Sequence, residues 1–116
     1  MGREFTESLK EKMDEYAHLV YGITKDFPKN ELYGTVSQLR RSALSVILNY
    51  IEGFARQRKA VKNNFWEISY GSLKESKYLL RFSLVEGYLK ENNYKKAIAL
   101  ADEIGAMLWR CLQSLK

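Results

Sequence analysis

The chain has 116 residues and a net charge of +5, and 46% of its residues are apolar. This length supports one domain with a hydrophobic core, spanning residues 1–116, and excludes two ordinary domains. With one proline and seven scattered glycines, the composition excludes a disordered chain, and no apolar stretch approaches the roughly 18 residues of a transmembrane helix. The N-terminal segment is not hydrophobic enough for a signal peptide, so we expect a cytoplasmic protein that does not enter a membrane.

A first helix is predicted between Phe5 and Phe27. Apolar residues recur there at spacings of three and four, which is the pattern of one face of an amphipathic helix. The stripe consists of Phe5, Leu9, Met13, Tyr16, Val20, Ile23 and Phe27. Pro28 disfavours helical backbone at the residue before it, so the helix should end before Pro28 and a turn should follow through Glu31.

A second helix, from about Leu32 to Phe54, carries an unusually wide apolar arc. Its core side consists of Val36, Leu39, Ala43, Ile47, Tyr50 and Phe54, flanked by Val46 on one side and by Leu44, Leu48 and Ile51 on the other. The arc covers roughly 200°, about twice what a helix resting on one core requires. The excess predicts a second packing partner for this helix.

The opposite face of the second helix is polar and is built partly from short side chains. It holds Gln38, Arg41, Ser45, Asn49 and Glu52. A solvated stripe is one interpretation. Short side chains such as Ser45 and Asn49 beside apolar residues are also typical of a face covered by another subunit. We therefore predict an oligomer interface that consists of Arg41, Leu44, Ser45, Leu48, Asn49 and Glu52.

Two further helices are predicted in the second half of the chain. Gly53 and the polar stretch from Arg56 to Asn64 indicate a connection, and a third helix should run from about Asn63 to Val85. Small residues on its central side, which allow a neighbouring helix to approach closely, are Ser69, Ser72, Ser76 and Ser83. After breaks at Gly87 and residues 92–93, a fourth helix carries the stripe Tyr94, Ala97, Ala101, Ile104, Leu108, Cys111 and Leu115. Short connections force antiparallel neighbours, so we predict an all-α fold, an antiparallel up-down four-helix bundle.

Basic residues gather in the middle of the chain. Residues 40–81 contain nine basic and three acidic side chains and carry a charge of +6, whereas the remainder carries −1. A basic surface attracts polyanions by releasing their condensed counterions. The asymmetry therefore indicates either nucleic acid or an acidic protein face as the partner.

A candidate nucleic-acid site follows the third helix and the connection before it. Tyr70, Lys74, Lys77, Arg81 and Tyr88 fall on one outward line, and four cations lie in the connection beside its start. Cations with aromatic edges contact phosphates and stack unpaired bases. The predicted site consists of Arg56, Arg58, Lys59, Lys62, Tyr70, Lys74, Lys77 and Arg81. A solubilising face is the alternative interpretation, because no recognised nucleic-acid motif is present.

Enzyme chemistry has little support in this sequence. His18 is the only histidine, and together with Glu15 it forms a single Glu-x-x-His match, whereas a di-metal bundle site needs two. Any nucleophile, including Cys111, would depend on this one imidazole as its base, and Cys111 itself falls in an apolar stripe that favours burial. We expect no catalytic residues, no metal site and no cofactor.

An ordered series of short motifs runs through nearly the whole chain. It consists of residues 21–34, 38–41, Ser45, Asn49, residues 52–54 with Arg56, Phe65, residues 71–75, residues 103–105 and Leu108. This series resembles the bacterial four helix bundle proteins, also called 23S rRNA intervening-sequence proteins. The family commonly has Ile-Pro-Ser before the asparagine where this chain has Val46, Ile47 and Leu48, so the second helix should run straighter here.

The resemblance implies a small bundle that assembles as a ring, a homopentamer, with a basic surface that binds RNA or DNA. A similar bundle accompanies the reverse transcriptase of diversity-generating retroelements, which implies an accessory role. We therefore hypothesise a non-enzymatic, homo-oligomeric adaptor that binds RNA or single-stranded nucleic acid through its basic face. The alternative is a protein-interaction module whose basic face docks an acidic partner, such as a polymerase or a reverse transcriptase.

Overall fold

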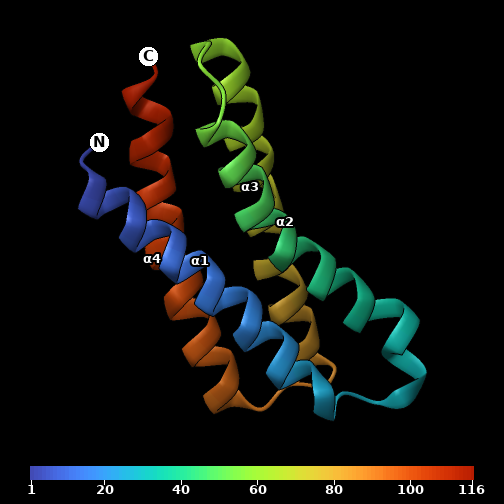
Figure 1. Cartoon of the computed structure of the whole chain (residues 1–116). Helices are drawn as coiled ribbons and strands as arrows, with labels where there is room; N and C mark the ends of the chain where they lie inside the picture. The colour runs from blue at the N-terminus through green and yellow to red at the C-terminus, as the bar shows by residue number, and fades with distance from the viewer.

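Four α-helices make up the fold, and no strand is present. In the computed structural model, which describes residues 1–116, α1 spans Arg3–Ile23, α2 spans Ser37–Phe54, α3 spans Lys59–Val85 and α4 spans Glu91–Ser114. Each helix runs opposite to the one before it, so both termini lie at the same end of the molecule (Figure 1). The predicted all-α architecture of four helices is confirmed. None of these helices combines the length and apolarity that a membrane crossing requires.

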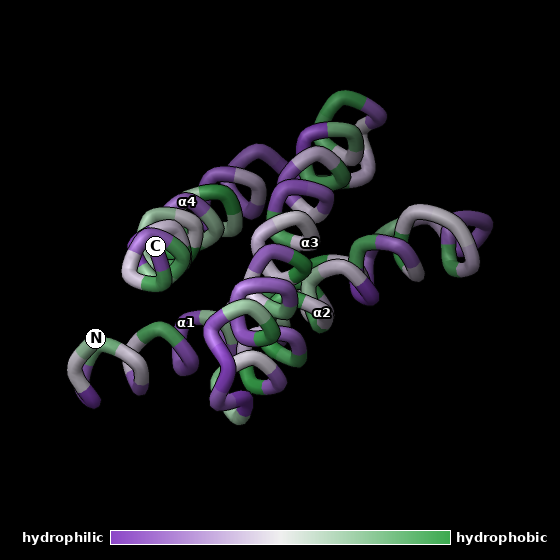
Figure 2. Tube along the Cα trace, turned by 90° about the horizontal axis from the view of Figure 1, so that it is seen from above, coloured by the Kyte–Doolittle hydropathy of each residue, from purple (hydrophilic) through white to green (hydrophobic).

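The most extensive helix contact is between α2 and α3, with α4 packed on α3 and α1 packed on α2 to complete the bundle (Figures 1 and 2). Every helix contributes large, fully buried side chains to one core: Leu9, Met13, Tyr16, Leu39, Tyr50, Leu73, Leu80, Ile104 and Leu108. Full burial of one apolar side chain of this size stabilises the fold by about 1.5–3 kcal/mol. The apolar stripes read from the sequence therefore supply the contacts that hold the four helices together.

Small residues set the close approach of α2 and α3. The Ser69 hydroxyl donates a hydrogen bond of 2.6 Å to the backbone oxygen of Val46. Gly53 lies against the Trp66 indole, so closely that a Cβ atom at Gly53 would lie 2.5 Å from Trp66 Cδ1. The same indole donates from Nε1 to the backbone oxygen of Tyr50 at 3.1 Å. The contact is therefore specified by hydrogen bonds as well as by apolar packing.

The connection between α1 and α2 begins earlier than predicted. α1 ends at Ile23, and a 3₁₀ turn follows over Thr24–Asp26. Phe27 has an extended backbone (φ −68°, ψ 156°), as expected for a residue before proline. Its buried ring packs against Tyr88, with the ring centroids 5.9 Å apart. Phe27 thus reaches the core from the connection and not from the helix, although its position in the apolar stripe was predicted.

The start of α2 also differs from the prediction of an unbroken helix from Leu32. A 3₁₀ turn over Lys29–Glu31 leads into a π-helical turn over Leu32–Val36, in which Gly34 leaves helical geometry (φ −110°, ψ −109°). The Glu31 carboxylate accepts hydrogen bonds from the hydroxyl and the backbone N–H of Thr35. These local contacts compete with a regular first turn. From Ser37 onward α2 has no break, as the missing proline predicts.

Candidate nucleic-acid interface

Two of the predicted cations, Lys59 and Lys62, lie on α3 itself. We placed them in the connection, but α3 begins at Lys59 and not near Asn63. None of residues 59–62, which precede the predicted start, is a helix breaker. Three of them are lysine or alanine, which are strong helix formers, so the helix begins directly after Arg58. No acidic residue occupies the first turn. The lysines therefore add to the positive end of the helix dipole, and this end of α3 attracts anions.

Three of the seven predicted cations are held by neighbouring groups within the subunit. Arg56 is paired with Glu52 at 3.0 Å. Lys62 donates from Nζ to the last backbone oxygen of α2 at 3.2 Å. Lys77 forms an ion pair with Asp102 of α4. The two ion pairs offset the charges of Arg56 and Lys77, and the hydrogen bond occupies one of the three N–H donors of Lys62.

The other four predicted cations are exposed and form no ion pair: Arg58, Lys59, Lys74 and Arg81. From Lys59 to Arg81 the helix rises about 33 Å at 1.5 Å per residue, so these side chains form a long track and not a compact patch. Lys74 and Arg81 lie two turns apart on the same side of α3. Tyr88, predicted on this line, instead packs against the α1–α2 connection.

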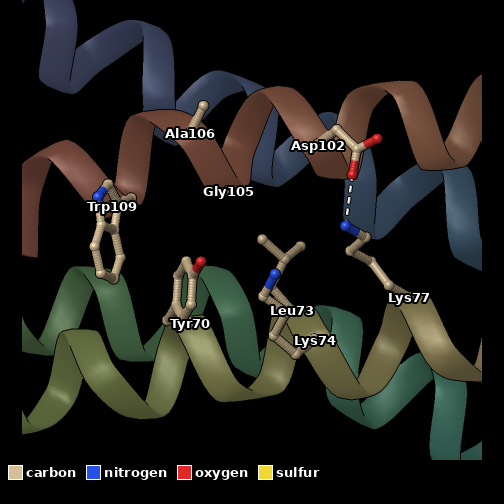
Figure 3. A pocket seen from close by; sticks show the side chains of 8 residues that line it. All are labelled: Tyr70, Leu73, Lys74, Lys77, Asp102, Gly105, Ala106 and Trp109. Carbon is tan, nitrogen blue, oxygen red and sulfur yellow. Dashed lines mark ion pairs between the residues drawn. The ribbon is translucent and has the colours of Figure 1, made fainter.

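A groove between α3 and α4 brings part of the predicted site together with residues of α4 (Figure 3). It has a volume of about 380 Å³ and is lined by Tyr70, Leu73, Lys74, Lys77, Asp102, Gly105, Ala106 and Trp109. The Tyr70 and Trp109 rings meet at a centroid distance of 5.9 Å. Lys74 Nζ lies 5.2 Å from the centroid of the Tyr70 ring. A planar, anionic ligand suits this lining, because the rings offer stacking faces and the cation attracts negative charge.

Trp109 and Asp102 were not among the predicted site residues. Trp109 comes directly after Leu108 of the apolar stripe, so it points away from the core, and it is 50% exposed. A large aromatic residue at an outward position of an amphipathic helix was a usable signal of a binding surface. Asp102 gave no such signal, because its pairing with Lys77 depends on how α3 and α4 are aligned.

The predicted oligomer face of α2 contains both exposed apolar residues and polar residues that are bonded within the subunit. Leu44, Leu48 and Ile51 are 38%, 54% and 46% exposed, so one subunit leaves them partly in water. Ser45 and Asn49, however, have partners inside the subunit. The Ser45 hydroxyl shares a hydrogen bond of 2.8 Å with a serine hydroxyl of α3, and Asn49 Nδ2 donates to Ser45. The α2–α3 contact therefore explains these short side chains, and the exposed apolar residues alone favour a second packing partner.

Arg41 and Glu52, the other two predicted interface residues, are exposed. Phe54 was placed on the core side of α2 but is 53% exposed. At this end α2 separates from the start of α1 (Figure 1), and a groove of about 200 Å³ opens between them. The side of the last turn of α2 that faces α1 therefore lies outside the core, whereas Gly53 on the same turn is buried against α3. Arg40, in contrast, binds within the subunit, where Nε donates to the Thr24 hydroxyl at 2.9 Å.

His18 and Cys111, the residues considered for enzyme chemistry, do not lie together. His18 is exposed and lies 3.4 Å from Asp14 on the same helix. Cys111 is fully buried, and burial raises the pKa of its thiol, which keeps it in the unreactive protonated form. No group of three or more histidine, cysteine, aspartate or glutamate side chains is placed to hold a metal ion.

Comparisons with known proteins agree with the fold. The family model described as "23S rRNA-intervening sequence protein" matches residues 8–110. A crystal structure from Bacteroides thetaiotaomicron VPI-5482, described as a protein with unknown function from the S23 ribosomal protein family, has a similar fold with a TM-score of 0.81. It is 21% identical, and the match covers 90% of this chain and 97% of that one. No curated protein matches the sequence.

Proposed function

The chain belongs to the 23S rRNA-intervening sequence protein family, and from this premise we propose that it is a non-enzymatic, homo-oligomeric adaptor that binds RNA or single-stranded nucleic acid. The observation that carries the proposal is the pair Lys74 and Arg81. Both cations are exposed on one side of α3, and neither has a carboxylate partner. Unpaired cations on a rigid helix are available to phosphate groups without first breaking an ion pair.

The start of α3 supports the same proposal. Arg58 and Lys59 are exposed there, next to the positive end of the helix dipole. One subunit thus offers two weak anion-binding regions, one at the start of α3 and one along its second half. A strand that reaches both would gain affinity from their combination, because the second contact becomes intramolecular.

Self-association would multiply this surface. The exposed residues Leu44, Leu48 and Ile51 form an apolar strip along α2 that a single subunit leaves in water. We propose that this strip packs against a further copy of the chain, in a ring of the kind that the resemblance implies, a homopentamer. Several copies of a modest cationic track then bind one RNA more tightly than a single copy does.

Charge reversal tests the nucleic-acid proposal. We expect the double variant Lys74→Glu, Arg81→Glu to bind single-stranded RNA far more weakly than the wild type. The slope of log affinity against log salt should also fall by about 0.7 for each lost phosphate contact. Fluorescence anisotropy with a labelled RNA strand, repeated from low to physiological salt, measures both quantities.

Lys25→Glu, Lys29→Glu is the matched control, because it makes the same change of net charge in the exposed α1–α2 connection. This control should keep most of the wild-type affinity. Equal losses in the two double variants would mean that only net charge matters. Wild-type affinity that does not depend on salt would contradict the proposal.

The second candidate function is docking to an acidic protein. Exposed aromatic residues accompany the cations, with Tyr78 on α3 and Trp109 on α4, and protein interfaces are enriched in tyrosine, tryptophan and arginine. A pull-down from nuclease-treated lysate separates the candidates. A partner protein that stays bound after nuclease treatment supports docking, and a partner lost with the RNA supports the adaptor.

A further inference from the structure

We propose that the α3–α4 groove holds one unpaired nucleotide of a single-stranded RNA, with its base stacked on Trp109 and its phosphate at Lys74. The inference rests on the proposed function and assigns the site within it. The groove lies beside the cationic track of α3 and shares Lys74 with it. The strand is therefore held both by its charge and by one of its bases.

The aromatic end of the groove supplies the stacking surface. Trp109 is 50% exposed, although burial is favourable for so large an apolar side chain. Its ring is tilted by 43° from that of Tyr70, so the two rings do not cover each other's faces. Figure 3 shows Trp109 extending from α4 toward α3 and Tyr70 extending from α3 toward α4, next to each other at one end of the groove. A flat base placed here covers apolar ring surface that the subunit leaves exposed.

Two ammonium groups lie over these rings. Lys74 Nζ is 5.2 Å from the centroid of Tyr70, and Lys116 Nζ is 6.0 Å from the centroid of Trp109. Neither lysine has a carboxylate partner. A base that stacks at this end therefore brings its own phosphates close to two available positive charges, which a neutral aromatic ligand would not use.

The other end of the groove is closed by the ion pair between Lys77 and Asp102 (Figure 3). A carboxylate accepts hydrogen bonds and repels phosphate. The phosphate is therefore directed toward Lys74, and the carboxylate is left to accept from a base amino group or a ribose hydroxyl. This polarity favours a nucleotide over a simple polyanion, because only the nucleotide offers donors at one end and negative charge at the other.

The dimensions of the groove favour a single unpaired nucleotide. Its volume of about 380 Å³ is near the lower end for small-ligand sites. Two of its lining residues on α4, Gly105 and Ala106, are small. A duplex keeps its bases stacked inside the helix and presents none to this groove. We therefore infer that the groove selects single-stranded RNA over duplex RNA of the same charge.

The test compares two 12-nucleotide strands, one normal and one in which abasic sites replace the bases. Wild-type protein should bind the normal strand at least about fivefold more tightly, the lower end expected for stacking one base. Trp109→Ala should bind the normal strand at least about fivefold more weakly and abolish the difference between the strands. Trp109→Phe, which keeps a stacking face, should retain most of it. The salt slope should stay close to the wild-type value in both variants, because every cation of the site is kept.

Tyr33→Ala is the matched control, since this exposed tyrosine lies in the α1–α2 connection, outside the groove and off α3, and it should leave the affinity for both strands unchanged. Ala106→Leu gives an independent check, because it adds bulk at the α4 edge of the groove without altering charge or the aromatic pair. It should also reduce the preference for the normal strand.

If Trp109→Ala and Ala106→Leu bind the normal strand as tightly as the wild type does, the groove assignment is wrong while the RNA-binding proposal stands. If the wild type binds neither strand, the proposed function itself is wrong, and the groove assignment fails with it.

Discussion

At Gly53 the backbone of α2 lies directly against the Trp66 ring. An added Cβ atom would lie 2.5 Å from Trp66 Cδ1 and 3.1 Å from the backbone oxygen of Lys62. The ring is not free to move, because its Nε1 donates to the backbone of α2. Overpacking of this kind costs about 1–3 kcal/mol, so Gly53→Ala should lower the free energy of unfolding by that amount. Denaturant unfolding followed by circular dichroism measures the change.

Gly71 provides the matched control for this substitution. It also lies within a helix, but a Cβ atom there would meet nothing within 4 Å. Alanine is favoured over glycine inside a helix by up to about 1 kcal/mol, so Gly71→Ala should raise the free energy of unfolding. A similar loss of stability in both variants would contradict the assignment of Gly53 to a tight contact.

Tyr16 and Tyr50 should make the fold sensitive to alkaline pH. Burial raises the pKa of Tyr16 to about 12 and also raises the pKa of Tyr50. The folded state therefore keeps protons that the unfolded chain loses above pH 10. The free energy of unfolding should therefore be unaffected by these tyrosines below pH 10. As pH rises from 10 toward 12, it should fall by about 1.4 kcal/mol per pH unit for each tyrosine. Denaturant unfolding at several pH values between 8 and 12 gives this slope.

The two tyrosines should respond differently to loss of the hydroxyl. The Tyr50 hydroxyl is buried, and its only polar neighbour is the Cys111 thiol, a weak hydrogen-bonding group, so Tyr50→Phe should leave stability at pH 7 unchanged or higher. The Tyr16 hydroxyl shares a hydrogen bond of 2.7 Å with Ser76, and Tyr16→Phe should cost about 1 kcal/mol. In each variant, the free energy of unfolding should fall less between pH 10 and 12 than it does in the wild type. A larger cost at Tyr50 than at Tyr16 at pH 7 would contradict this account.

At the scale of whole helices, hydrophobic periodicity predicted the number, order and buried faces of the four elements. It succeeded because the stripes on α1 and α4 are regular and supply fully buried residues such as Met13 and Leu108. Helix ends were less predictable. Side-chain contacts of Glu31 with Thr35 favour a π-helical turn at the start of α2, and helix-forming residues extend α3 back to Lys59.

The candidate site was only partly predictable for a related reason. The line through Tyr70, Lys74 and Lys77 follows from the helical repeat of α3 alone. The groove needs α4 as its second wall, and the ion pair of Lys77 with Asp102 depends on the alignment of two helices. The packing of the helices thus decides which cations lack an ion-pair partner, and the periodicity of a single helix cannot predict this.

At the scale of the whole molecule, the apolar strip of α2 connects the fold to the proposed assembly. Leu44, Leu48 and Ile51 lie on the surface of α2, and the subunit covers each of them only in part. Burial against another copy would gain free energy in proportion to the apolar area covered, about 25 cal/mol per Å². The cost of association opposes this gain, so the strip must be covered by a well-matched surface to hold a ring together.

Charged residues in this strip test the assembly. Leu44→Glu, Leu48→Glu should leave helical content unchanged, because both side chains are exposed in the subunit, but should make association unfavourable by placing carboxylates in an apolar contact. Light scattering should then report a mass near the 13.6 kDa of one subunit, well below that of the wild type. Val85→Glu introduces a similar charge at an exposed apolar position at the end of α3 and should leave the wild-type mass unchanged. A wild-type mass of one subunit, or a double variant with the wild-type mass, would contradict packing of a second copy on this strip.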